Sequence, residues 1–229
     1  MVIFLSIGVL LFACLPGFVW LSLFLKEDIH PEPKSLVVKT FGIGALITLF
    51  VLGLELIFQF SIGPSYSKFA FYSMLTLALL EELGKFFAGY FYIRKKPEFD
   101  EPVDAMIYMM AISLGFATVE NIFIVSSYIF SPHIISLFDV GETVALRFIG
   151  ATLLHTLTGA IMGYFWAKGI LKRTAWKYIF AGLLIVVGIH FTFNYLIVLF
   201  QSINMLYPTI FLVAVSFFVL KDFEKIKEE

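Results

Sequence analysis

Seven long apolar stretches restrict the fold of this chain more than any other feature of its sequence. A helix needs about 20 mostly apolar residues to cross a lipid bilayer. Stretches of about that length cover roughly residues 2 to 25, 36 to 58, 69 to 93, 104 to 130, 144 to 167, 178 to 200 and 203 to 220. The pattern therefore predicts an all-α, polytopic bundle of about seven transmembrane helices in the cell membrane.

The composition agrees with this prediction. Charged residues make up only 14% of the chain, compared with about 25% in a typical soluble domain. No long polar segment separates the apolar stretches, so residues 1–229 are expected to form a single membrane-embedded domain. The net charge of −1 gives no electrostatic reason to bind nucleic acid. Because Cys14 is the one cysteine, a disulfide framework and a cysteine-based zinc site are excluded.

The positions of the basic residues predict the orientation of the bundle. Twelve of the sixteen lysines and arginines lie on alternate connections or in the C-terminal tail, whereas the opposite connections hold only Lys68 and Arg147. Short cytoplasmic loops collect lysine and arginine. We therefore expect the N-terminus outside and the C-terminus in the cytoplasm.

Polar side chains recur near the middle of four predicted spans. Counted from the cytoplasmic end of its own span, at about 1.5 Å per residue, each lies roughly 16 to 24 Å deep. They are Glu81, Glu82, Glu120, His155, His190 and Asn194. Such groups cost several kcal/mol in a bilayer unless they are paired or hydrated. Their convergence at one depth predicts a functional cluster, whereas Glu55 has no partner at helical spacing and is assigned to packing.

Helical spacing indicates which way several of these groups face. His155 shares a helix face with Gly159 and Gly163, and small residues at this spacing let a neighbouring helix come close. His190 and Asn194 also share a face. Each polar group thus lies on a stripe with small or polar neighbours, which is typical of an inward face.

Lys85 lies one helical turn from both Glu81 and Glu82. It can pair with one carboxylate and hold it ionised, which leaves the other able to titrate. Two adjacent glutamates can therefore hold different protonation states. The spacing alone leaves open which of the two would act as a base.

Three classes of function fit this set of groups. The first is hydrolysis, in which a carboxylate activates water while imidazole and amide donors stabilise the oxyanion. The second is a metal-dependent site built from Glu and His on facing helices, although the sequence has no Glu-x-x-His or His-Glu-x-x-His pair. The third is a non-enzymatic proton or ion relay. We expect the first class, with no metal and no cofactor.

Four short motifs follow one another along the chain. The first two are Glu81-Glu82-x-x-Lys85 and Phe116-x-x-x-Glu120-Asn121; the third pairs Arg147 with His155, and the last is His190-x-x-x-Asn194. In this order they resemble the motifs of the PrsW family of prokaryotic membrane proteases, which is related to the glutamic intramembrane proteases that process CAAX proteins. The resemblance extends over about residues 16 to 195.

The resemblance implies an endopeptidase that cuts a membrane-anchored protein, of the anti-sigma-factor kind, within or next to the bilayer. By position, Glu81 would activate the water, Glu82 and Lys85 would support it, and His190 and Asn194 would bind the oxyanion. The expected partners are a membrane-protein substrate and the lipid bilayer. The candidate catalytic residues are Glu81, Glu82, Lys85, Glu120, Asn121, His155, His190 and Asn194.

Overall fold

A computed structural model describes residues 2–27, 30–68, 70–129, 137–200 and 206–228. Within these residues the chain forms eight α-helices, two short 3-10 helices (Leu25–Glu27 and Gly63–Ser65) and no strand. The α-helices are α1 (Val2–Phe24), α2 (Lys34–Ile62), α3 (Phe71–Ile93), α4 (Asp104–Ile129), α5 (Leu137–Ile149), α6 (Ala151–Leu171), α7 (Ala175–Phe200) and α8 (Leu206–Lys227).

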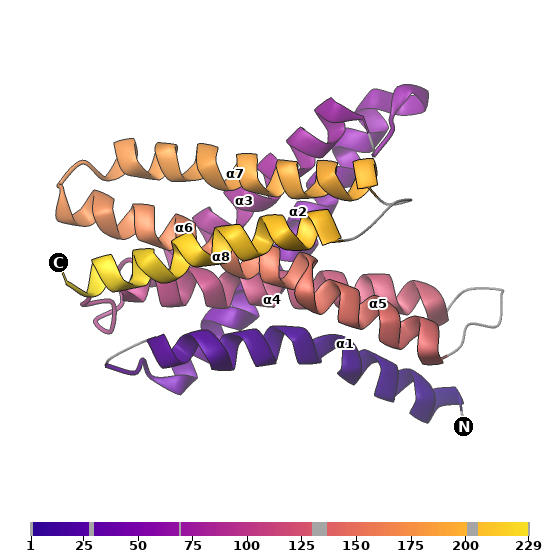
Figure 1. The fold of residues 1–229 in the computed structure, drawn as a ribbon, viewed down its shortest axis with the longest axis horizontal. Helices are drawn as coiled ribbons and strands as arrows, with labels where there is room; N and C mark the ends of the chain where they lie inside the picture. The colour runs from indigo at the N-terminus through magenta and orange to yellow at the C-terminus, as the bar shows by residue number, and fades with distance from the viewer. Residues whose placement is uncertain (1, 28–29, 69, 130–136, 201–205, 229) are drawn as a thin grey trace.

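The prediction of an all-α, polytopic membrane fold is confirmed. Six helical segments are long and apolar enough to cross a membrane. The remaining helix, α3, is 23 residues long and carries Glu81, Glu82 and Lys85 along its middle. Figure 1 shows the start of α1 and the end of α8 at opposite ends of the long axis, as an odd number of crossings requires. The orientation stays a prediction, and the predicted boundaries at 69, 130 and 203–205 lie outside the described residues.

The fifth predicted span differs from the expected single helix over 144 to 167, because α5 and α6 are separated at Gly150. This residue has φ −109° and ψ −100°, away from the helical region. Its N–H still donates to the Leu146 carbonyl at 2.9 Å. A Cβ built on Gly150 would lie only 2.7 Å from that carbonyl oxygen, so the break needs glycine. Because of this break, α5 and α6 are two separate helices and need not share one axis.

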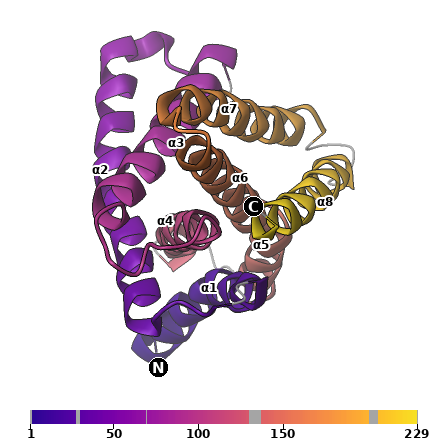
Figure 2. The same ribbon diagram turned by 90° about the vertical axis from the view of Figure 1, so that its left-hand side faces the viewer.

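Helix α4 is the centre of the bundle. Residues 103–118 are all buried, and α4 packs against α6, α2 and α1. Figure 2 shows α4 enclosed by these helices, with the long helix α2 crossing the bundle at one side. A helix that is apolar on all sides and buried on all sides is typical of a core span.

Glycines allow α4 to lie very close to its neighbours. A Cβ on Gly115 would lie 2.0 Å from the Phe41 carbonyl oxygen of α2, and one on Gly163 would lie 2.3 Å from the Ala105 carbonyl oxygen of α4. A Cβ on Gly159 would also clash with α4. The prediction that the Gly159 and Gly163 stripe admits a neighbouring helix is therefore confirmed, and that neighbour is α4.

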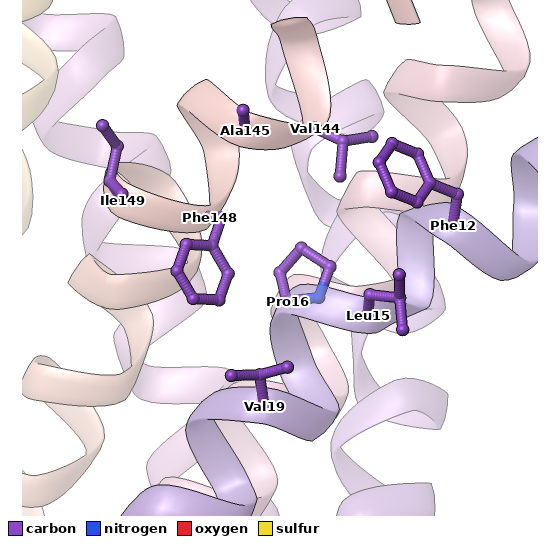
Figure 3. Close-up of a pocket in the computed structure, with 8 residues that line it drawn as sticks. All are labelled: Phe12, Leu15, Pro16, Val19, Val144, Ala145, Phe148 and Ile149. Atoms are coloured by element: carbon purple, nitrogen blue, oxygen red, sulfur yellow. The ribbon is translucent and has the colours of Figure 1, made fainter. Parts of the chain in front are cut away.

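Helices α1 and α5 enclose a pocket of about 340 Å³ at the edge of the bundle. Figure 3 shows its lining, with Pro16 and Val19 on α1 and Val144 and Phe148 on α5. All of the lining residues are apolar. The pocket therefore contains none of the polar side chains that the sequence predicts to form a functional cluster.

Candidate active site

The carboxylate of Glu82, on α3, is held by donors from three helices. Its Oε1 lies 2.6 Å from Lys85 Nζ, 2.7 Å from His190 Nδ1 on α7 and 3.3 Å from the Thr158 hydroxyl on α6. The Glu82 and Lys85 side chains are 2% and 1% exposed. Lys85 thus pairs with one of the two adjacent glutamates, as expected, and the partner is Glu82.

Lys85 also connects α3 to a second acidic group on α4. Its Nζ lies 3.0 Å from Nδ1 of His155. Because a lysine ammonium only donates, His155 Nδ1 accepts this bond and the ring proton is on Nε2. Nε2 in turn donates to Glu120 Oε2 at 2.9 Å. Lys85 and His155 therefore join the carboxylates of Glu82 and Glu120 in one network.

Arg147 of α5, which the third motif pairs with His155, completes this network. Its Nη2 lies 3.3 Å from Glu120 Oε2, and its Nε donates to Asn121 Oδ1. Asn121 Nδ2 donates to the Thr152 hydroxyl at 3.1 Å. Asn121 therefore supports the cluster through Arg147. Among the described residues its side chain forms no hydrogen bond with another predicted site residue. Arg147 precedes His155 by about two helical turns, but the motif alone did not indicate that it contacts Glu120 and Asn121.

Glu81 has an environment opposite to that of its neighbour Glu82. Its Oε2 is buried, and within the described part of the chain no protein group forms a hydrogen bond with it. The Nε2 atom of His190 lies 3.8 Å away, beyond hydrogen-bond distance. Glu81 is therefore next to the network but not held by it.

Asn194 and Glu55 form none of the hydrogen bonds of the cluster among the described residues. Asn194 lies one turn after His190 on α7 and is half-buried, and no described side chain of the cluster hydrogen-bonds to it. Glu55, on α2, interacts electrostatically with Glu120 and with Glu81. Helical spacing within α2 assigns Glu55 to packing, because the charges that interact with it lie on α3 and α4.

Three donors at the site raise the question of a metal ion. Glu81, His155 and His190 each offer one ligand atom, and these atoms lie within 4.8 Å of one another. Two histidines and a carboxylate form a known donor set for catalytic zinc. However, both ring nitrogens of His155 are engaged, by Lys85 and by Glu120. Two ligand atoms remain where zinc needs three, and the Lys85 ammonium would repel a cation. The site as folded therefore does not fit a metal ion.

Comparison with known proteins supports the assignment suggested by the motifs. The family model described as "PrsW family intramembrane metalloprotease" matches residues 32–220. The chain is 33% identical to Protease PrsW of Geobacillus kaustophilus over 186 residues. These residues cover 80% of this chain and 76% of the relative. It is 30% identical over 178 residues to Protease PrsW of Clostridioides difficile, covering 76% and 72%.

A third relative, Protease PrsW of Bacillus subtilis, is 31% identical over 157 residues, which is 67% of this chain and 65% of the relative. No solved structure matches the chain. The family model covers the residues that form the cluster, from Glu81 to Asn194. The chain therefore belongs to the PrsW protease family and is a multi-pass membrane peptidase.

Proposed function

We propose that this chain is a glutamic intramembrane endopeptidase, in which Glu81 takes a proton from the attacking water. The observation that carries the proposal is the contrast between two adjacent carboxyls. Glu82 Oε1 accepts hydrogen bonds from three side chains, whereas Glu81 Oε2 has no protein partner among the described residues. An acceptor that already has strong donors is a poor base, so this contrast favours Glu81.

His190 is suited to hold the water against Glu81. Glu82, paired with Lys85, is ionised and can only accept, so His190 Nδ1 carries a proton and donates it. In the neutral ring Nε2 is then an acceptor, and it lies 3.8 Å from Glu81 Oε2. This separation exceeds a direct hydrogen bond, and a bridging water can bond to both atoms.

The reaction then proceeds by general base and general acid catalysis. Glu81 accepts a proton as the water oxygen forms a bond to the peptide carbonyl carbon. The same carboxyl returns the proton to the amide nitrogen as the carbon–nitrogen bond breaks. One carboxyl can serve both steps because the proton that it takes from the water is the proton that it returns to the leaving nitrogen.

Oxyanion stabilisation is assigned first to Asn194. Its amide is half-buried, one turn from His190 on the same helix, and has two donor hydrogens. His190 adds a donor only when both of its nitrogens are protonated. The remaining residues, Lys85, His155 and Glu120, are positioning residues that keep Glu82 ionised and His190 oriented.

The substrate that we propose is a membrane-anchored protein of the anti-sigma-factor kind, cut close to the membrane. The cluster is carried by transmembrane helices, which supports cleavage of a segment within or next to the bilayer. A metal-dependent protease is the second candidate, since three possible ligand atoms lie within 4.8 Å. The metal-dependent mechanism is less favoured, because both nitrogens of His155 already form hydrogen bonds, with Lys85 and with Glu120.

The experiment that tests the proposal compares membrane proteomes of cells that make the native chain, the Glu81→Gln variant or no chain. We expect a small set of single-span proteins to lose their membrane-distal fragments only with the native chain. The Glu142→Gln variant is the matched control, because Glu142 is exposed on α5 and has no role in the proposed chemistry. Identical fragments with the native chain and with Glu81→Gln would contradict the glutamic mechanism.

A further inference from the structure

A groove between α2 and α4 leads away from the catalytic cluster. It has a volume of about 530 Å³, within the usual range for ligand sites. Its walls are six α2 residues between positions 49 and 59, together with Tyr66 after α2 and Phe123 of α4. Most of the lining is apolar, and the polar groups are Glu55, Gln59 and Tyr66.

The groove lies beside the cluster, because its lining residue Phe123 follows Glu120 by one turn of α4. At the inner side, Glu55 interacts electrostatically with Glu120 and Glu81. At the other side, burial and the negative charge of Glu55, with a smaller contribution from Tyr72, raise the pKa of Tyr66. Tyr66 lies in the α2–α3 connection, which the distribution of basic residues places outside the cell. A chain that occupies the groove would therefore run from the catalytic glutamate toward the outer surface.

Charge pairing leaves Glu55 without a cation. Lys85 is paired with Glu82, and Arg147 is paired with Glu120. Among the ion pairs of the described residues, none includes Glu55. An ionisable group in a membrane-spanning helix is costly unless it is paired or hydrated. A cation that enters the groove would give Glu55 the ion-pair partner that it lacks among the described residues.

We propose that this groove binds the part of the substrate on the outer side of the cleaved bond, and that Glu55 pairs with a lysine or arginine of that segment. The proposal rests on the peptidase function proposed above. Apolar contacts with α2 and Phe123 would hold the backbone, and Gln59 and Tyr66 would supply hydrogen bonds near the outer end. The carboxylate would set the preference for a basic residue, because acidic side chains would be repelled by both Glu55 and Glu120.

The test measures binding separately from cleavage. The full-length Glu81→Gln variant in detergent micelles is titrated with synthetic single-span peptides that carry Lys, Gln or Glu at one position of the outer flank. We expect the Lys peptide to bind about tenfold more tightly than the Gln peptide, as for one desolvated charge pair. The Glu peptide should bind most weakly.

Removing the Glu55 charge should remove this preference. Adding Glu55→Gln should make the Lys and Gln peptides bind equally, with little change for the Gln peptide, whereas adding Glu142→Gln should leave the preference intact. If Glu55→Gln does not fold, the comparison of the three peptides on the Glu81→Gln variant still tests the charge preference. Glu55→Asp, which keeps the charge, should then keep the preference for the Lys peptide. Equal binding of all three peptides, no binding, or a Lys preference that survives Glu55→Gln would overturn the proposal.

The outcome also separates this proposal from the proposed function. Cleavage by the native chain without a Lys preference would reject the groove assignment alone. A Lys preference that depends on Glu55, in a chain whose native form cleaves none of the peptides and no membrane protein, would reject the peptidase mechanism and leave a peptide-binding groove.

Discussion

The ammonium of Lys85 lies 3.0 Å from Nδ1 of His155, and this contact between α3 and α6 joins the two acidic parts of the site. On one side Lys85 holds Glu82, and on the other side His155 holds Glu120. Because lysine has no acceptor, the direction of donation along this path is fixed. A change at Lys85 should therefore affect both carboxylates.

Lys85→Met should destabilise the fold and abolish activity. The substitution leaves Glu82 buried without a cation, and breaking a buried ion pair typically costs about 3–5 kcal/mol. Thermal unfolding in detergent should show a large loss. The double variant Lys85→Met/Glu82→Leu should recover much of the stability and none of the activity. A Lys85→Met protein as stable as the native chain would show that this pair contributes little.

Asn194→Ala should lower turnover with little effect on stability. Loss of one oxyanion donor typically reduces the rate about 10²- to 10³-fold, and no described hydrogen bond of the cluster depends on this side chain. His190→Ala should reduce both turnover and stability, because Glu82 loses a donor at 2.7 Å. Tyr195→Phe, at an exposed position beside Asn194, serves as the control. Unchanged turnover with Asn194→Ala, measured on a purified substrate, would remove Asn194 from the mechanism.

Gly163→Ala should weaken the contact between α6 and α4. The new methyl would lie 2.3 Å from the Ala105 carbonyl oxygen, and overpacking of this kind costs about 1–3 kcal/mol. Gly188→Ala is the matched control on α7, because nothing lies within 4 Å of a Cβ there. Unfolding temperatures should fall for the first variant and stay level or rise for the second. Equal unfolding temperatures would mean that the close approach is not required.

The spans could be predicted from the sequence because runs of about 20 apolar residues have few alternatives to a membrane helix. The sequence also predicts the common depth of four polar groups, because the rise per residue of a helix converts position along the chain into depth. These groups are Glu81, Glu120, His155 and His190. The structure confirms that these groups meet. The pairing of Lys85 with Glu82, and not with Glu81, could not be predicted in this way. Glu82 also accepts hydrogen bonds from His190 and Thr158, which come from other helices.

Two features could not be predicted, for related physical reasons. Arg147 belongs to the third motif, but its contacts with Glu120 and Asn121 depend on how α5 lies beside α4, which is a tertiary feature. Glu55 has no neighbour at helical spacing on its own helix, and its neighbours come from α3 and α4. Contacts between helices depend on crossing geometry, which local periodicity does not encode.

Metal removal should leave cleavage intact. Both nitrogens of His155 are engaged by side chains, and Lys85 already compensates one of the carboxylates. Purified protein should therefore contain less than one metal ion per chain, and exhaustive chelation should not change the cleavage rate. If chelators abolish cleavage, Zn²⁺ restores it and His155→Ala lowers the bound metal, the metal-dependent mechanism replaces the glutamic one.

The most direct test of the account is the turnover of Glu81→Gln beside Glu82→Gln, with the unfolding temperature of each protein measured in the same detergent. We predict that Glu81→Gln folds as well as the native chain, because Oε2 has no hydrogen-bond partner among the described residues, and that its cleavage rate falls by at least about 10²- to 10⁴-fold. Glu82→Gln should instead lose stability, because its charge pairs with Lys85. A Glu81→Gln protein that cleaves substrate at the native rate would contradict the assignment of Glu81 as the base.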